Sequence, residues 1–464
     1  MGDEPATSRV SPKKVIVLGG GLAGLSAARR LLDHGFSVTL VEKRPFLGGR
    51  AFSFREDEGD NTVEVDNGQH VFLGCNSYYR EYLDAIGATG KTYLPDTLRT
   101  QVVRNGVSGT LASKAWLGRL HLLPSFLTYP HLGLKDKLLV LYGLLVVKLT
   151  RRSKRSADLD SESFYDWLKR HGQTAPAIEN FWNLFTLPAL NDGVRDVSAD
   201  MGLMVFQEAL LGRPGDASIG LAKVGLTALN GEPAQRYIEA RGGELVLGRS
   251  AGSIIIEDGR ISGVELSSGD VLEGDSYVSA LPHKTLLETL PEEVRSSSHF
   301  NVANDLTSSP IVGIHMWYDR EIMDEDFVAF LESPVQWVFN KSRIQGRRSE
   351  NGQYVCVSLS GAWHFVDTPK KELIEQFTAE MARLFPRAAD ARVERTHVVK
   401  ELNATFRSTP GAARHRLPQA TPIPNLYLAG DWTQTGWPST MESAVRSGVF
   451  AADLIAEPEP TPHR

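Results

Sequence analysis

The residues best placed to do chemistry form a glycine-rich turn near the N-terminus, residues 19–24, which reads GGGLAG. The turn contains the pattern G-x-G-x-x-G: Gly19 permits a tight turn, Gly21 lets backbone approach a pyrophosphate, and Gly24 lets a helix pack against a strand. Glu42 lies 18 residues beyond Gly24, where a carboxylate can accept hydrogen bonds from a ribose 2′-hydroxyl. Because this carboxylate would repel a 2′-phosphate, the pattern predicts NAD or FAD and argues against NADP.

The segments around this turn have the composition needed to position it. Residues 14–18 (KVIVL) predict a buried parallel strand, residues 25–35 have helical spacing, and residues 37–41 predict a second strand that ends at Glu42. The helix N-terminus would offer free N–H groups and the positive end of its dipole to phosphates. A glycine turn kept only for packing is the alternative interpretation.

A second glycine pair follows the predicted second strand, in residues 43–50 (KRPFLGGR). This segment resembles the Gly-Gly-Arg element of the amine oxidase, protoporphyrinogen oxidase and phytoene desaturase flavoproteins. The resemblance implies FAD as the cofactor, with the backbone of Gly48 and Gly49 close to it and Arg50 supporting the pyrophosphate as a planar cation. Taken alone, GGR is a common surface turn.

The C-terminal region repeats the arrangement of strand, glycine turn and helix. Residues 425–429 (NLYLA) predict a strand, residues 430–442 contain the turn, and residues 443–455 predict a helix. Asp431 can bind the ribityl hydroxyls or support the pyrophosphate, and the N–H groups of Thr440 and Met441 can face the flavin O2 edge. That region offers no Cys, His or Tyr for covalent attachment, so we expect FAD to be held non-covalently. A structural helix with a polar cap is the alternative.

The middle of the chain contains a second β-rich region. Residues 243–248, 253–256 and 261–266 predict strands, with turns at Asp258-Gly259 and at 268–270. Residues 277–281 (YVSAL) predict another buried strand, and in the flavoprotein group such a strand returns the chain to the FAD domain. The resemblance places Ala251 where the family contacts the adenine, whereas an ordinary β-meander would bind nothing.

These elements predict an α/β fold with a discontinuous Rossmann-like FAD-binding domain, of the two-dinucleotide-binding-domain type, and an α+β substrate domain. The predicted FAD-binding domain comprises residues 13–100, 235–300 and 415–456. The predicted substrate domain comprises residues 101–234 and 301–414. Residues 116–190 are mainly helical by pattern, with core aromatics in residues 162–172, and residues 1–12 and 457–464 are predicted to be flexible tails.

Two segments narrow the resemblance further: residues 63–79, which contain Asp66-Asn67-Gly68-Gln69-His70, and residues 430–448, which contain Gly436-Trp437-Pro438. Together they resemble the hydroxysqualene dehydroxylases of bacterial hopanoid pathways, once labelled squalene-associated FAD-dependent desaturases. The resemblance spans residues 14–455, and residues 191–196 (NDGVRD) depart from it by their charge. It implies that reduced FAD gives a hydride to hydroxysqualene, an apolar isoprenoid, as its hydroxyl leaves, producing squalene.

This reaction requires an acid, because hydroxide is a poor leaving group. The candidates are His70, Asp66 and Asp192, although Asp66 also fits a turn that bonds backbone amides and His70 also fits a satisfied imidazole. Trp437 either closes the pocket over the flavin or belongs to the core. The full set of residues expected at the cofactor is Gly19, Gly21, Leu22, Ala23, Gly24, Glu42, Lys43, Gly49, Arg50, Gly68, Gln69, His70, Ala251, Gly430, Asp431, Trp437, Thr440 and Met441.

Charge and cysteine content limit the compartment and the partners. The formal net charge of −6 gives no reason to expect nucleic acid as a partner. The two cysteines, Cys75 and Cys356, form neither a disulfide framework nor a CxxC pair, which favours a reducing, cytoplasmic compartment. We expect no metal site. The polar residues 1–12 lack the apolar centre of a secretory signal.

Residues 116–150 raise the question of membrane contact. Their longest apolar run, residues 138–147 (LLVLYGLLVV), is about half as long as a membrane-spanning helix. Aromatic and aliphatic side chains here precede Arg151, Arg152, Lys154 and Arg155, which suits peripheral contact with anionic lipid on the inner face of the cytoplasmic membrane. A buried helix of the substrate domain explains the same run, because a short segment that is apolar all round also describes a core helix.

Two other functions remain open. An oxidative isoprenoid desaturase of the phytoene type would use the same fold and cofactor with the opposite redox direction. Proteins that escort prenylated GTPases use this fold to bind lipid without flavin chemistry. The intact glycines of the N-terminal turn, Glu42 and the Gly430-Asp431 turn argue against the escort function.

Overall fold

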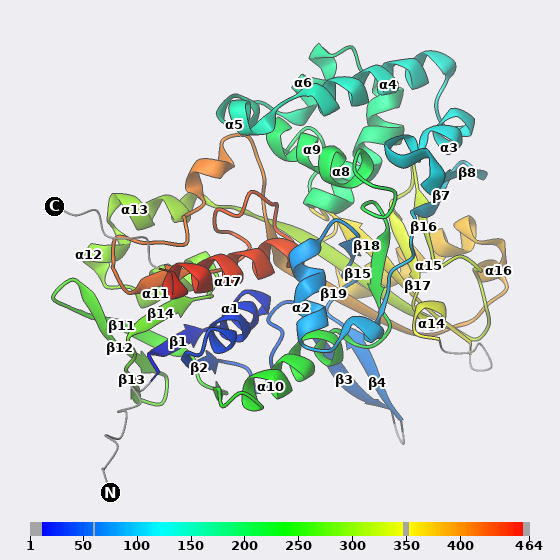
Figure 1. The fold of residues 1–464 in the computed structure, drawn as a ribbon. Helices are drawn as coiled ribbons and strands as arrows, with labels where there is room; N and C mark the ends of the chain where they lie inside the picture. The colour runs from blue at the N-terminus through cyan, green and yellow to red at the C-terminus, as the bar shows by residue number, and fades with distance from the viewer. Residues whose placement is uncertain (1–11, 59–60, 347–351, 458–464) are drawn as a thin grey trace, which may run out of the picture.

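A computed structural model describes residues 12–58, 61–346 and 352–457, so the predicted flexible tails fall almost entirely outside the described residues. The fold has a parallel sheet beside two packed helices, a larger mostly antiparallel sheet, and a group of helices at the outer end of the larger sheet (Figure 1). The α/β class predicted from the sequence is confirmed.

The first sheet has five strands, and every neighbouring pair is parallel. Its strands come from three distant stretches of the chain, and each of the strands predicted for this sheet is present. In spatial order they are β10 (Glu244–Leu247), β2 (Ser37–Glu42), β1 (Lys14–Leu18), β14 (Ser276–Ser279) and β20 (Leu426–Leu428). Because all strands run the same way, their carboxyl ends meet at one edge, where α/β folds bind their ligands.

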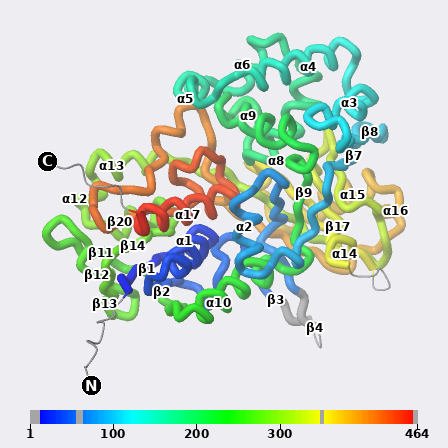
Figure 2. Tube along the Cα trace, viewed as in Figure 1, coloured from blue at the N-terminus to red at the C-terminus, as the bar shows by residue number. Residues whose placement is uncertain are grey.

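Helices α1 (Leu22–Asp33) and α17 (Met441–Ala456) lie side by side although they come from opposite ends of the chain (Figure 2). The Ser26 hydroxyl donates to the carbonyl of Val445 over 3.0 Å. Gly448 brings the two backbones together, since a Cβ placed there would lie 2.1 Å from the carbonyl oxygen of Ala23. The small residues along one side of α17 therefore serve helix contact.

A buried carboxylate ties α17 to α2 (Ser77–Ala85), whose first residues have no side-chain cap of their own. Glu442 accepts the backbone N–H groups of Tyr78 and Tyr79 at 3.2 and 2.8 Å and an N–H of Arg446 at 2.7 Å. It thus supplies from a distant helix the negative charge that a helix N-terminus favours.

The second large sheet has seven strands and carries a separate core. In order they are β19 (Val393–Phe406), β15 (Ser308–Tyr318), β18 (Gln353–Ser360), β17 (Trp337–Asn340), β16 (Phe327–Phe330), β7 (Arg99–Arg104) and β8 (Val107–Ala112). Only β16 and β7 pair in parallel. Helix α15 (Lys370–Leu384) packs its buried Leu373, Phe377 and Met381 in the core of this sheet.

Smaller strands complete the β structure. The predicted hairpin turn at Asp258-Gly259 is confirmed: both residues have positive φ, 49° and 74°. The remaining strands are β3 (Ser53–Glu58) and β4 (Asn61–Asp66) in one hairpin; β11 (Ala251–Glu257), β12 (Arg260–Leu266) and β13 (Val271–Leu272) in one antiparallel sheet; and β5 (Phe72–Leu73), β9 (Ile219–Ala222) and β6 (Thr92–Tyr93) in another.

The helical character predicted for residues 116–190 is confirmed. Phe164, Trp167 and Leu168 are fully buried, as their helical spacing predicted, and they pack with Trp182 and Phe206 in one aromatic core. The main helices here are η2 (Ala115–Leu120), α3 (Leu123–Thr128), α4 (Leu134–Leu149), α5 (Arg152–Asp160), α6 (Phe164–Arg170), α8 (Asn183–Leu190) and α9 (Ala199–Val205). Elsewhere the chain forms α10 (Glu232–Glu239), α11 (His283–Thr289), α12 (Glu292–Arg295), α13 (Ser298–Asn301), α14 (Lys341–Ile344) and α16 (Pro386–Ala389).

We predict that Gly448→Ala lowers the free energy of unfolding by about 1–3 kcal/mol, because its Cβ would meet a backbone carbonyl that cannot move without shifting α1. Thermal unfolding of the purified protein measures the effect. Gly90→Ala is the matched control, since a Cβ there has no neighbour within 4 Å. Equal melting temperatures for the two variants would contradict the close packing of α1 on α17.

Candidate active site

The predicted glycine turn lies at the carboxyl edge of the parallel sheet, directly between β1 and α1. Gly19 has a φ of 107°, and its N–H donates to the carbonyl of Val41 at 2.8 Å. A Cβ on Gly24 would lie 1.9 Å from the carbonyl oxygen of Gly19. Both glycines are thus required by the protein's own packing, as the G-x-G-x-x-G pattern predicted.

Gly21 differs from its neighbours in having no such requirement. Its φ and ψ of −79° and 177° suit any residue, and a Cβ there would make only an ordinary contact of 3.6 Å with the Cα of Gly49. Packing within the chain therefore does not explain the glycine. Space for a ligand's pyrophosphate beside the backbone does explain it, so the turn fits a dinucleotide.

The start of α1 is equally suited to an anion. Gly21 is its N-cap and provides no side-chain hydrogen bond, and no acidic residue occupies the first turn, which begins Leu22-Ala23-Gly24. The N–H groups of a helix start that lacks a side-chain cap can bind phosphate oxygens.

Glu42 is buried at the end of β2. Its two carboxylate oxygens accept the N–H groups of Gly20 at 2.7 Å and Arg44 at 2.9 Å, which leaves further lone pairs for ribose hydroxyls. The N–H of Arg249 donates to the backbone carbonyl of Glu42 at 3.1 Å, and this contact brings the start of β11, with Ala251, toward the same edge. Lys43 is exposed.

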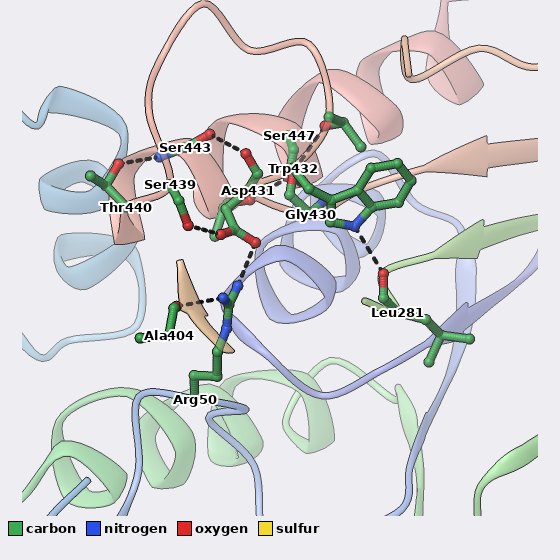
Figure 3. A network of polar contacts seen from close by, with 12 residues as sticks. Arg50, Leu281, Ala404, Gly430, Asp431, Trp432, Ser439, Thr440, Ser443 and Ser447 are labelled. Carbon is green, nitrogen blue, oxygen red and sulfur yellow. Dashed lines mark hydrogen bonds and ion pairs between the residues drawn. The ribbon is translucent and has the colours of Figure 1, made fainter. Parts of the chain in front are cut away.

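Arg50 and Asp431, predicted from opposite ends of the sequence, form an ion pair. The Arg50 guanidinium lies 2.5 Å from one carboxylate oxygen of Asp431 and donates to the carbonyl of Ala404 at 2.7 Å (Figure 3). The hydroxyl of Ser439 bonds the other carboxylate oxygen of Asp431. Gly49, next to Arg50, lies directly against the N-terminal glycine turn, because a Cβ on Gly49 would lie 2.7 Å from the Cα of Gly21.

The turn after β20 is held in place by hydrogen bonds that it donates to α17 and to the segment directly after β14 (Figure 3). Gly430 has a φ of 144°, and its N–H donates to the Ser447 hydroxyl at 2.7 Å. The indole N–H of Trp432 donates to the carbonyl of Leu281 at 3.0 Å. The Thr440 hydroxyl caps α17 by accepting the N–H of Ser443 at 3.2 Å, and Met441 begins the helix.

Asp66, at the end of β4, is fully buried and ion-paired with Lys341 over 2.7 Å. Its other oxygen accepts the Ser53 hydroxyl at 2.7 Å and the N–H of Leu226 at 3.0 Å. Burial alone would raise the pKa of this carboxyl, but the charge and hydrogen bond of Lys341 hold the pKa below its usual value, helped by the Ser53 and Leu226 bonds. Asp66 is therefore an anion that positions the loop after it.

That loop, residues 67–70, rests on the seven-stranded sheet and reaches Arg50. The Asn67 amide donates to the carbonyl of Arg50 at 3.2 Å, and Gly68, with a φ of 80°, lies against Gly313 of β15. The Oε1 of Gln69 is buried without a hydrogen-bond partner in the described chain. A buried orphan acceptor beside the Arg50 loop fits a site that receives a polar ligand.

His70 is half-buried, and its Nδ1 lies 3.4 Å from the carbonyl of Gly68. Burial lowers the pKa of His70, so its imidazole is mainly neutral near pH 7 and, once protonated, is a stronger acid than an ordinary histidine. His315, fully buried on β15, has its Nδ1 2.7 Å from the Tyr354 hydroxyl, while its Nε2 has no partner in the described chain. Burial lowers the pKa of His315 to about 3.

Asp192 lies apart from Asp66. It is buried and accepts hydrogen bonds from Arg407 at 2.9 Å, Ser309 at 3.2 Å and Trp363 at 3.3 Å. The loop after Asp66 contacts β15 at Gly313, four residues and about 13 Å along the strand from Ser309, which bonds Asp192. The charge noted in residues 191–196 is thus accounted for by the ion pairs of Asp192 and Asp196 with Arg407.

Trp437 is buried and packs in the aromatic core of the helical region. The guanidinium carbon of Arg446 lies 4.6 Å from the centre of its ring. Two further buried groups had no signal in the sequence. Lys341 follows a strand and has the appearance of a surface residue, and Arg416 donates to the carbonyls of Asp431 and Thr433. Burial lowers the pKa of Arg416 to about 10.

We predict that Gly21→Ala lowers the affinity for FAD by at least tenfold, a loss of ~1.4 kcal/mol or more, because the Cβ takes the space of the pyrophosphate, and that the variant purifies with less FAD. The FAD-free protein should melt at the temperature of FAD-free wild type. Acid precipitation measures the FAD and should release all of it, as expected for non-covalent binding. Gly24→Ala, which clashes with Gly19, should lose both cofactor and stability. A fully loaded Gly21→Ala protein would contradict the assignment.

We predict that Lys341→Met lowers the free energy of unfolding by about 3–5 kcal/mol at pH 7, because it leaves Asp66 as a buried unpaired carboxylate. Without the cation, burial raises the folded-state pKa of Asp66 above its unfolded value, so the loss should shrink as the pH falls toward 4. Urea unfolding at both pH values measures this. Arg343 lies on the same helix as Lys341, and Arg343→Met, which breaks only the exposed pair with Asp326, should cost under about 1 kcal/mol.

Comparison with known proteins agrees with this geometry. A zeta-carotene desaturase of Zea mays is 27% identical over 490 residues, covering 96% of this chain and 84% of the relative. A 15-cis-phytoene desaturase of Synechococcus elongatus is 26% identical over 484 residues, covering 95% of each chain. Among solved structures, cyclohexylamine oxidase from Brevibacterium oxydans superposes with a TM-score of 0.69 at 19% identity, covering 96% of this chain and 99% of that one.

The family described as flavin-containing amine oxidoreductases matches residues 22–456, nearly the whole chain. FAD, the cofactor implied by the resemblance of residues 43–50 to flavoproteins, is confirmed, and the protein is an FAD-dependent oxidoreductase. The chain belongs to the flavin-containing amine oxidoreductase family.

Proposed function

We propose that this protein reductively removes the hydroxyl of hydroxysqualene to give squalene, within hopanoid or squalene biosynthesis. The observation that carries the proposal is the position of residues 66–70, the segment most typical of hydroxysqualene dehydroxylases. They lie between Arg50 and β15, so they join the cofactor side to the larger sheet. We propose that residues 13–100, 235–300 and 415–456 bind FAD and that residues 101–234 and 301–414 bind the substrate.

The reaction breaks an allylic C–O bond and forms a C–H bond, and the oxygen leaves as water after it is protonated. Reduced FAD, when bound, supplies the hydride and is oxidised. The chain supplies the proton, and we propose His70 as its donor, with Asp66 and Asp192 in positioning roles. Asp66 is held ionised by Lys341 and Asp192 is bonded to Arg407, whereas His70 has only a long contact to a carbonyl.

The chain also has to keep water from the allylic cation. Trp437 brings the turn after β20 into contact with the aromatic core of the helical region, which includes Phe181, Trp182 and Phe206. We propose that this apolar side receives the isoprenoid chain. The carotenoid desaturases among the relatives support an apolar isoprenoid-type substrate.

Those relatives also favour a second candidate, oxidative desaturation of a phytoene-type carotenoid. Both reactions need the same fold, cofactor and apolar substrate side. They differ in whether flavin gives or takes the hydride, and only hydroxyl removal needs a proton donor such as His70. The non-catalytic escort function is disfavoured because the chain belongs to a flavin-containing oxidoreductase family.

We place the protein in the cytoplasm, in peripheral contact with the inner face of the cytoplasmic membrane, where a water-insoluble substrate is dissolved. In the part of the chain that the structure describes, no helix combines the length and apolar character needed to cross a bilayer.

The deciding experiment is an anaerobic single turnover of photoreduced holoprotein with hydroxysqualene, with product analysis by mass spectrometry. Squalene should form in step with the return of oxidised-flavin absorbance. A parallel reaction of oxidised holoprotein with phytoene should give no product. Desaturated phytoene without turnover of hydroxysqualene would establish the oxidative alternative.

The same assay tests His70. His70→Gln should lower the rate by about 10²–10⁴, the usual contribution of a general acid, with normal FAD content. Because burial lowers the pKa of His70, the wild-type rate should rise as the pH falls through 6.5, and the variant should lack this rise. Asp192→Asn, which keeps the acceptor for Arg407, should change the rate much less. An unchanged rate in His70→Gln would assign the proton to another group.

A further inference from the structure

The large apolar side chains that are exposed gather in one region of the fold. Of 13 such residues among those described, eight lie between positions 116 and 149, and the other five are scattered. The eight are each 51–81% exposed and belong to η2, α3 and α4 or directly adjoin them. They are Trp116, Leu120, Leu127, Leu134, Leu138, Tyr142, Leu145 and Leu149. We call this set the apolar face.

Helix α4 provides most of this face and lies at the outer edge of the molecule (Figure 1). Its exposed residues, from Leu134 to Leu149, recur every three or four positions and so form a single stripe. The opposite stripe, Val140, Gly143 and Val147, is buried. The helix is therefore only half covered, although its composition is apolar all round.

The helix is firmly held from its buried side. A Cβ on Gly143 would lie 2.8 Å from the ring of Trp182, and the amide of Gln173 donates to the carbonyl of Leu139 at 2.7 Å. Gln207 donates to the carbonyl of Val147 at 2.6 Å. The exposed stripe is thus a fixed feature of the folded chain, and large unpaired apolar patches of this kind mark interaction sites.

The charge around the apolar face indicates what binds there. Residues 114–155 contain nine Lys and Arg but a single acid, Asp136, so their formal charge is +8 in a chain whose net charge is −6. The rest of the chain therefore carries −14. A symmetric dimer formed through this face would oppose +8 with +8, whereas an anionic bilayer surface attracts it. Apolar side chains edged by cations match a bilayer containing acidic phospholipid.

The structure also shows which cations are available. Among the cations in α4 and directly after it, five are exposed: Lys135, Lys148, Arg151, Lys154 and Arg155. Arg152, in contrast, makes two hydrogen bonds to the buried Asp200, at 2.9 and 3.0 Å. Including Arg152 among the lipid-facing cations, as its place in the sequence suggested, is therefore wrong.

We infer that the apolar face and these five cations form the surface by which the protein docks on an anionic lipid bilayer. At 16 residues α4 is about 24 Å long, too short to cross the hydrocarbon, so it lies in the plane of the interface. Leucines and Tyr142 enter the acyl boundary while the cations contact lipid phosphates. The docking surface itself does not depend on the proposed function. Only the reason for docking does, namely that the protein takes a water-insoluble substrate from the membrane.

Flotation of purified holoprotein with lipid vesicles tests the inference without any substrate. At low salt the wild type should float with phosphatidylcholine–phosphatidylglycerol vesicles and much less with phosphatidylcholine alone. Leu138→Ser/Leu145→Ser should weaken binding by roughly tenfold or more, since even partial insertion of two leucines supplies that much. A variant with Gln at Lys148, Arg151, Lys154 and Arg155 should lose the preference for phosphatidylglycerol.

Val271→Ser/Leu402→Ser is the matched control, because it removes two exposed apolar residues outside the apolar face and should float like wild type. FAD content should stay normal in every variant, and detergent-dispersed hydroxysqualene should be turned over as by wild type. Wild type that stays at the bottom with both vesicles would overturn the inference, as would equal flotation of the leucine variant. Flotation without turnover would instead refute the proposed function and leave the docking surface standing.

Discussion

The structure depends on backbone packed directly against backbone around the N-terminus of α1. A side chain on Gly24 would strike the carbonyl of Gly19, and one on Gly448 would strike that of Ala23. A side chain on Gly49 would strike the Cα of Gly21. These three approaches bring together the first strand, the Gly-Gly-Arg loop and the C-terminal helix. Gly21, in contrast, has space for a Cβ. That space lies where the uncapped N–H groups of α1 and the carboxylate of Glu42 can hold a dinucleotide.

This constraint explains why the cofactor side could be predicted well from the sequence. Each strand–turn–helix unit is encoded within about 30 residues, and glycine has few other reasons to recur at those spacings. The errors are at the boundaries. The first helix begins at Leu22 rather than Leu25, directly after its glycine cap, and the last begins at Met441 because Thr440 caps it. A periodicity argument finds the apolar repeat but not the cap that starts the helix.

The residues that sequence reasoning missed act over long range. Lys341 neutralises Asp66 from 275 positions away, and Glu442 caps a helix 363 positions earlier. Lys341 lies in no local pattern, Glu442 lies in the C-terminal motif without a predicted role, and both have the residue type of an ordinary surface position. The exposed stripe of α4 was hidden for a related reason. When all sides of a helix are apolar, the sequence cannot show which side packs, and here Gly143 against Trp182 decides it.

The buried pair of Asp66 and Lys341 also connects the two halves of the site. Asp66 ends a strand beside the Gly-Gly-Arg loop, and Lys341 begins the helix after β17 of the larger sheet. The Arg50 guanidinium donates to the carbonyl of Ala404 on β19, and Gly68 lies against Gly313 of β15. The larger sheet and the helix after β17 therefore support both the Gly-Gly-Arg loop and the loop after Asp66. A buried ion pair contributes little net stability when it replaces apolar packing, but it tolerates only one geometry. The pair thus serves to fix the position of His70 relative to both sheets, and the dehydroxylation that we propose needs its proton donor held in one place.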